Sequence, residues 1–481
     1  MTQGEKSAAI LLIHGIGEQR PYETIDAFVQ GLGRRLKITP GRLEHRLTMC
    51  GDRVTTSVRI DAPEPVGRFG TRFLDVYEFH WAGMVEGKIR LHQVLRWLVI
   101  VALTPLRLWS YQATLPAEAG AKGKGLPFRF LVGELLRSSL LLLVALLIVG
   151  PFVYAAFHWG LLRDVIKAFW AGFLALKNPG GWALLGTTVL IAGSILLGYV
   201  RLGPWLRASE GTERTALSQW RNVSAIAVVF LGILAALIRN AFRLDVLGFV
   251  RGIWVVVTQR EVALALGLGW LAFLLSGILV KYVGDIALYT TADENSSFFR
   301  TRTKILEGAT MLLQTLCDDP TYEGVYVAGH SLGSVIGYDC INRVVRDARV
   351  PGTEPAAGRR VSRIRGLLTF GSPLDTVYYF FRTVVSPGQP VRAQVLSSLH
   401  AFRKKRSGRD YGPFQFARYE LPKMDDFTWL NVYSPTDPVS RRLVFYQVDR
   451  QESRAFSPNP VDAHLAYWSD DRFYQMVSEW L

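Results

Sequence analysis

One serine in the sequence stands in a motif that is typical of a catalytic nucleophile. Residues 329–333 read Gly-His-Ser-Leu-Gly and stand between a β-rich run at 325–328 and a predicted helix. Between a strand and a helix, this spacing is typical of a nucleophile elbow, a tight turn that lifts a serine hydroxyl above a sheet. We therefore predict Ser331 as a nucleophile, and a purely structural glycine-rich turn is the alternative.

A second motif could stabilise the negative charge that develops during attack on a carbonyl. Residues 13–18 read Ile-His-Gly-Ile-Gly-Glu and follow an apolar run at 8–13 that predicts a buried strand. An oxyanion hole takes one backbone N–H from the residue after the nucleophile and another from the loop after an earlier strand. The sequence thus predicts an oxyanion hole at Leu332 with Ile16 and Gly17, and an ordinary turn is the alternative.

A serine nucleophile also needs a base, and the base needs an acid that orients it. In sites of this type the chain order is serine, acid, histidine, which leaves His464 and His400 as candidate bases. His464 is favoured because it lies in a loop-like stretch before a predicted terminal helix, and His400, beside a basic run, is the alternative. Asp437 follows a predicted strand at 429–433 and has a proline on each side, so it is the preferred acid. Asp375, after the preceding predicted strand, is the alternative acid, and a loop aspartate is often only a surface residue.

The elements that position these residues fall into three zones. Residues 1–90 contain predicted strands at 8–13, 54–60 and 73–81 and a predicted helix at 21–37. Residues 285–481 again alternate strands and helices, which is typical of a mostly parallel sheet flanked by helices. We expect these two zones to form one α/β domain, with residues 91–284 inserted between them.

The inserted zone is predicted to be a transmembrane helical domain. Each candidate span is free of charged residues and close to the length of about 20 residues that a spanning helix needs, and basic residues and tryptophans stand near the ends. We expect four spans, and six is the alternative count. Helices buried in a protein core are the alternative to a membrane domain. Because no cleaved signal peptide is predicted, we expect a multi-pass protein with a cytosolic catalytic domain. The four runs are 138–157, 180–200, 222–238 and 262–280.

Composition narrows the classes of partner. The formal net charge is +15, but no motif combines aromatic and basic residues as nucleic-acid-binding proteins do, so we expect membrane lipids and an ester substrate as partners. The three cysteines lack CxxC spacing, and the sequence has neither HExxH nor a glycine-rich nucleotide loop. No metal and no cofactor are therefore expected, and no oligomeric state is predicted.

Taken together, these motifs resemble a known family. The resemblance is to the alpha/beta-hydrolase lipases, above all the class 3 lipases and the membrane-bound GPI inositol-deacylase group. It implies an alpha/beta-hydrolase fold, a Ser331–Asp437–His464 triad and carboxylic ester substrates, lipids among them. An acyltransferase or a thioesterase could use the same triad, and an inactive hydrolase-like membrane scaffold is the alternative from another class. The motifs that carry the resemblance are His14-Gly15, GHSLG at 329–333, FGSP at 370–373, DPV at 437–439, and His464 followed by Tyr467-Trp468.

Overall fold

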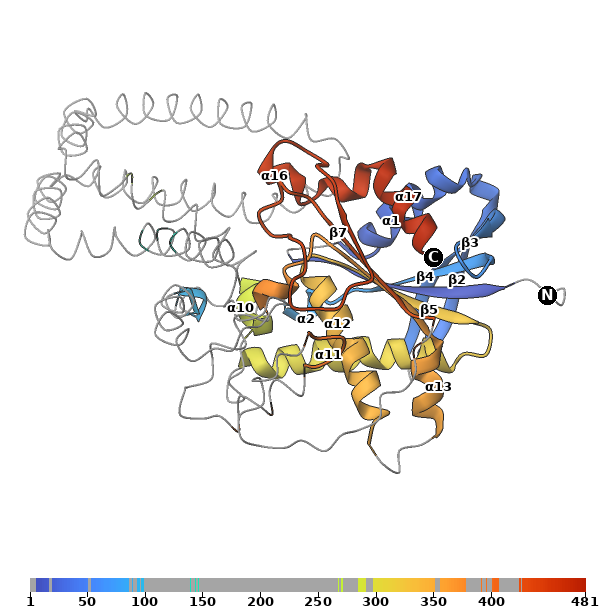
Figure 1. The fold of residues 1–481 in the computed structure, drawn as a ribbon, viewed down its shortest axis with the longest axis horizontal. Coiled ribbons are helices and arrows are strands. Elements are labelled where there is room, and N and C mark those ends of the chain that lie inside the picture. The colour runs from blue at the N-terminus through green and yellow to red at the C-terminus, as the bar shows by residue number, and fades with distance from the viewer. Residues whose placement is uncertain are drawn as a thin grey trace, which may run out of the picture. The chain divides into compact units, whose positions relative to one another are not determined.

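The structure, a computed structural model of the chain, is shown in Figure 1. Nearly all the residues that it describes belong to one compact unit, formed by residues 1–145 and 275–481. The described residues are 6–16, 20–50, 53–85, 284–290, 297–350, 355–377, 400–405 and 426–481, with isolated positions at 89, 93–95, 97–98, 139, 143, 146, 267, 270, 391, 395 and 424.

An eight-stranded sheet is built from strands of both globular zones, in the order β2-β3-β4-β1-β5-β6-β7-β8. Of the described strands, β3 alone runs in the opposite direction, because it pairs antiparallel with β2 and β4 while the other neighbours pair parallel. The sheet is therefore mostly parallel. Its strands are β1 (Ser7–Ile13), β2 (Leu43–Cys50), β3 (Arg53–Val66), β4 (Thr71–Phe79), β5 (Gly324–His330), β6 (Ile364–Phe370), β7 (Thr428–Tyr433) and β8 (Arg450–Ser453).

Helices cover both faces of this sheet. Figure 1 shows α1 and α17 on one face and α11, α12 and α13 on the other, and each group contributes to a separate hydrophobic core cluster. The described helices are α1 (Glu23–Leu36), α2 (Ala82–Val85), α10 (Gly284–Thr290), α11 (Ser297–Asp318), α12 (Leu332–Asp347), α13 (Pro355–Arg363), α16 (Pro460–Ala463) and α17 (Asp471–Trp480), with 3-10 turns η1 (Pro40–Arg42) and η3 (Ala466–Ser469).

The position of β1 in the middle of the sheet, with a hydrophobic cluster on each face, explains why its sequence is apolar without alternation. Ala9, Leu11 and Ile13 belong to the cluster under α11 and α12, whereas Ile10 and Leu12 belong to the cluster under α1 and α17. Successive side chains of a strand point to opposite faces, and a parallel strand covered on both faces must be apolar at every position. Each fully buried leucine or isoleucine contributes about 1.5–3 kcal/mol to folding.

The carboxyl ends of the parallel strands meet at one edge of the sheet. The chain leaves β1 toward β4 on one side, and β5 pairs with β1 on the other side. In open α/β sheets, ligands bind beyond the carboxyl ends of strands at such a switch in strand order. His14 follows β1, Ser331 follows β5, Asp437 follows β7 and His464 follows β8, so the fold brings the segments that carry the predicted site to this edge.

The predicted transmembrane insertion requires a correction. Among the residues that the structure describes, no helix combines the length and the apolar composition needed to cross a membrane. The 22-residue helix α11, for example, carries Arg300, Arg302, Lys304 and Glu307. Apart from isolated positions, the four charge-free runs themselves lie outside the described residues: 138–157, 180–200, 222–238 and 262–280.

The error has a physical reason. A run without charges indicates that a segment avoids water, but it specifies neither a helix of spanning length nor the medium in which the segment is buried. We therefore correct the fold class to an α/β fold with a mostly parallel eight-stranded sheet flanked by helices. The predicted multi-pass membrane location and the orientation derived from it are given up with the predicted spans.

Candidate active site

Ser331 occupies a strained turn between β5 and α12. Its backbone has φ 51° and ψ −126°, and a positive φ is uncommon for any residue other than glycine. Its N–H donates to the carbonyl of Phe370 at 3.0 Å, and the Ser334 hydroxyl donates to its carbonyl at 2.5 Å. Such conformations cost about 1–3 kcal/mol and persist where the surroundings enforce them. The turn is thus held by hydrogen bonds on both sides of the serine.

The two glycines of the motif are required by close approach of backbone to backbone. A Cβ atom at Gly329 would lie 2.5 Å from the carbonyl oxygen of Gly333. A Cβ atom at Gly333 would lie 2.2 Å from the carbonyl oxygen of Ile13. Any side chain at these positions would push the start of α12 away from β1, which explains the small residues on each side of the serine.

The loop after β1 passes directly against the nucleophile. A Cβ atom at Gly15 would lie 2.8 Å from the Cβ of Ser331. Ile16 follows in this loop and is half-buried against the core, whereas Gly17 lies outside the described residues. Leu332 is the first residue of α12, so its N–H has no acceptor within the helix. This arrangement can offer backbone donors to an oxyanion from two segments.

His14 fixes the conformation of this loop. The backbone N–H of Trp81 donates to His14 Nε2 at 3.1 Å, and the indole N–H donates to the His14 carbonyl at 3.0 Å. His14 Nδ1 donates in turn to the Gly15 carbonyl at 2.8 Å. Burial lowers the pKa of His14 to about 3, in spite of its bond to Gly15. A neutral imidazole in one tautomer therefore holds the loop beside Ser331.

Asp437 and His464 form the acid–base pair of the candidate site. His464 Nδ1 donates to Asp437 Oδ2 at 3.0 Å, and the carboxylate is fully buried. Burial by itself would raise the pKa of Asp437, but the hydrogen bond and charge of His464 and the N–H of Val439 outweigh it and lower the pKa to about 2. With Nδ1 occupied as a donor, Nε2 is the atom that can accept a proton. Nε2 is buried and has no hydrogen-bond partner within the described part of the chain.

His330 brings this pair to the elbow. It precedes Ser331, and its Nε2 donates to the backbone carbonyl of His464 at 2.9 Å, with the two imidazole centroids 4.8 Å apart. A Cβ atom at Gly371 would lie 3.0 Å from His330 and 3.2 Å from His464 Cε1. Burial and the neighbouring His464 lower the pKa of His330 to about 3, so His330 acts as a neutral donor.

The alternative base His400 and the alternative acid Asp375 make other interactions. His400 Nδ1 is 3.1 Å from Asp339 Oδ1, and its Nε2 is 2.8 Å from the Tyr446 hydroxyl. Asp375 accepts from the backbone N–H of Val444 at 2.7 Å. Both residues connect loop segments to the core, and the structure pairs neither with His464.

Tyr467 belongs to the site through a contact that was not predicted, since the sequence named it only as part of the motif after His464. Its hydroxyl donates to Asp437 Oδ2 at 2.9 Å, the same oxygen that accepts from His464. The available signal was the spacing of three residues between His464 and Tyr467, which places two side chains on one side of a helical turn. That spacing says nothing of a third residue 30 positions away, so the contact with the acid was not predictable.

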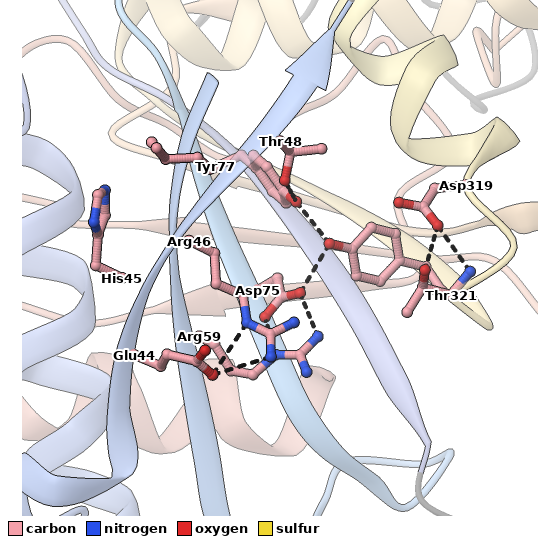
Figure 2. A pocket seen from close by; sticks show the side chains of 11 residues that line it. Glu44, His45, Arg46, Thr48, Arg59, Asp75, Tyr77, Asp319 and Thr321 are labelled. Atoms are coloured by element: carbon pink, nitrogen blue, oxygen red, sulfur yellow. Dashed lines mark hydrogen bonds and ion pairs between the residues drawn. The ribbon is translucent and has the colours of Figure 1, made fainter. Parts of the chain in front are cut away.

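The cavity shown in Figure 2 lies away from the candidate active site. About 410 Å³ in volume, it is lined by β2, β3, β4 and the segment that precedes β5, and by no member of the candidate triad. Arg59 binds Asp75 through two hydrogen bonds of 2.6 and 2.7 Å, and the Tyr322 hydroxyl donates to the same carboxylate at 2.8 Å. Tyr322 comes before β5, whereas Ser331 comes after it, and seven strand residues span roughly 23 Å. The cavity is therefore separate from the candidate active site.

Comparison with known proteins gives no relative of this chain. No family model, no curated protein and no solved structure matches it. The resemblance to lipases consequently rests on the motifs alone, and the function has to be argued from the arrangement of the chain's own residues.

Proposed function

We propose that the chain is a serine hydrolase that cleaves carboxylic esters through an acyl-enzyme intermediate. Ser331 is the nucleophile, His464 the general base and acid, and Asp437 the residue that orients His464. One observation carries the proposal. The Asp437–His464 pair, with a bond of 3.0 Å and an unpartnered buried Nε2 among the described residues, is bonded at 2.9 Å through the His464 carbonyl to His330, the residue that precedes a serine with φ 51°.

The reaction would proceed in two steps, acylation of Ser331 and hydrolysis of the acyl-enzyme. His464 Nε2 takes the proton of the Ser331 hydroxyl while the oxygen attacks the ester carbonyl, and the imidazolium then gives that proton to the departing alkoxide. Water attacks the acyl-enzyme with the same histidine as its base, which releases the acid and restores the serine. Backbone N–H groups of Leu332 and of the loop around Ile16 would stabilise the oxyanion in each step.

The surroundings of the nucleophile favour an acyl group without charge. His14 and His330 are neutral at ordinary pH, because burial lowers the pKa of each to about 3. Ile16 adds an apolar side chain directly after Gly15, the residue of this loop that lies against Ser331. Ser331 itself is only 1% exposed, so its hydroxyl is shielded from bulk water.

Labelling with a fluorophosphonate probe, which reacts with activated serines, tests the proposal. We expect the wild-type chain to be labelled and Ser331→Ala to be unlabelled. Ser478→Ala is the matched control, because that hydroxyl lies on α17 and bonds only to the Gln475 carbonyl among the contacts described; it should label like wild type. Labelling that persists in Ser331→Ala would show that the nucleophile is another residue. A wild-type chain that neither labels nor hydrolyses any of a series of esters would overturn the function itself.

A further inference from the structure

The hydroxyl of Tyr467 bonds to the same carboxylate oxygen of the acid as the base does. It donates to Asp437 Oδ2 at 2.9 Å, and that oxygen also accepts from His464 Nδ1 at 3.0 Å. The same hydroxyl accepts from the backbone N–H of Ser434 at 2.9 Å and lies 3.0 Å from the Ser440 hydroxyl. A phenol has one proton and an ionised carboxylate can only accept. The proton of Tyr467 therefore points to Asp437.

The position of Tyr467 in the chain makes this contact a link between two loops. Tyr467 lies on η3, three residues after His464, whereas Ser434 and Ser440 stand on either side of Asp437. The Tyr467 hydroxyl thus contacts Asp437 and both ends of the loop that carries it. The backbone of Tyr467 belongs to the segment that carries His464.

A rigid aromatic setting holds the ring of Tyr467. The residue has no exposed surface, and its ring centroid lies 4.7 Å from that of Phe456, 5.9 Å from Phe370 and 6.2 Å from Phe473. A packed ring with a polar tip is a fixed donor, because the side chain has few alternative rotamers. The hydroxyl can therefore fix the carboxylate in one orientation.

The buried carboxylate also needs this donor for its charge. A carboxylate without exposed surface is costly unless hydrogen bonds compensate for the lost water. Asp437 has His464 and Tyr467 on Oδ2 and the N–H of Val439 on Oδ1 at 2.8 Å. Burial, together with the charge of Asp437, raises the pKa of Tyr467 above its ordinary value, so the phenol keeps its proton at working pH.

We propose that Tyr467 is a positioning residue of the hydrolase, which acts on the reaction only by orienting Asp437 and through it His464. The inference rests on the proposed function, since its effect is read from the reactivity of Ser331. It assigns to Tyr467 no contact with the substrate.

Replacement of one hydroxyl tests the inference. Tyr467→Phe should lower the second-order rate of fluorophosphonate labelling, and kcat for an ester, by roughly 10- to 100-fold, the range for a lost hydrogen bond to a charged group, with KM unchanged. Tyr474→Phe is the matched control. It also removes a buried tyrosine hydroxyl, but one that donates to the carbonyls of Ala27 and Trp468 at 3.0 and 3.2 Å, and it should keep the wild-type rate.

A double-mutant cycle separates positioning from general support of the fold. If Tyr467 acts through Asp437, then Tyr467→Phe should have no further effect on the labelling rate in an Asp437→Ala background. A fall of equal size in both backgrounds would contradict the inference. Should Tyr467→Phe fail to fold, Ser440→Ala removes a neighbouring hydroxyl and leaves the ring in place. It should give a smaller fall that also disappears in the Asp437→Ala background, and an undiminished fall there would contradict the inference.

The failure of this inference is distinguishable from failure of the proposed function. Wild-type labelling at Ser331 with a Tyr467→Phe rate equal to that of Tyr474→Phe would overturn the positioning role alone. A wild-type chain without labelling and without ester hydrolysis would overturn the function, and the positioning role with it.

Discussion

His330 donates a hydrogen bond from Nε2 to the backbone carbonyl of His464 at 2.9 Å. The residue next to the candidate nucleophile therefore binds the loop that carries the candidate base. A site whose parts follow four strands needs such direct connections, because the loops after β5 and β8 begin at strands that are not neighbours in the sheet. Together with the bond between His464 and Asp437, this contact sets the base relative to the turn at Ser331.

Loss of the His330 contact should weaken the reactivity of Ser331. We expect His330→Ala to lower the rate of fluorophosphonate labelling about fivefold to tenfold, the range for one neutral hydrogen bond. His45→Ala is the control, because His45 is exposed on the edge strand β2, and its rate should equal that of wild type. Equal rates for the two variants would contradict the role given to His330.

The stability of the protein should depend on the ionisation of Asp437. Its folded pKa of about 2 lies below the unfolded value of about 3.9. The group therefore contributes stability that is fully present above about pH 5 and is lost as pH falls toward 2, and about 2 kcal/mol is the expected size. Urea unfolding of wild type and Asp437→Asn from pH 2 to 7 measures it. The difference between the two proteins should shrink as the solution becomes acidic, and a constant difference would count against an ionised Asp437.

The start of α12 should tolerate no side chain at Gly333. The carbonyl oxygen of Ile13 would lie 2.2 Å from a new Cβ atom, whereas a Cβ atom at Gly41 would meet nothing within 4 Å. We expect Gly333→Ala to lower the free energy of unfolding by about 3 kcal/mol, the upper range for overpacking, and Gly41→Ala to leave it nearly unchanged. Equal stability of the two variants would show that α12 can move away from β1 at little cost.

The buried ion pair near the cavity of Figure 2 should support the fold and leave the chemistry intact. Arg59 and Asp75 side chains are 5% and 1% exposed, so Asp75→Ala leaves an unpaired buried charge and should cost about 3–5 kcal/mol. Glu323→Ala breaks the exposed pair with Lys6 and should cost less than about 1 kcal/mol. Both should be labelled at the wild-type rate under conditions where they are folded, and a slow rate for folded Asp75→Ala would connect the cavity to the active site.

Local patterns in the sequence were sufficient to predict the central strands. The run at 8–13 had to be buried on both faces and forms β1, and the run at 325–328 lies within β5. The edge strand β2 was not predicted, because it leaves Leu47 and Met49 more than half exposed and so lacks a clear apolar face. An apolar run or a clear alternation predicts a strand, and β2 offers neither.

The candidate site was predictable where chain order restricts the choice and not where it depends on packing. Chain order restricted the base to two histidines, the strand and prolines around Asp437 favoured it as the acid, and the structure pairs Asp437 with His464. The contacts of Tyr467 and His330 arise from loops that meet only in the folded chain. The transmembrane prediction was wrong for a related reason: composition alone does not specify what surrounds an apolar segment.

Identification of the residue that carries a fluorophosphonate adduct tests the central claim most directly. Peptide mapping by mass spectrometry should find the adduct on Ser331 in wild type, and labelling should be lost in His464→Ala but retained in His400→Ala, whose imidazole lies with Asp339 and Tyr446. An adduct on another serine, or labelling that survives His464→Ala and disappears in His400→Ala, would contradict the account.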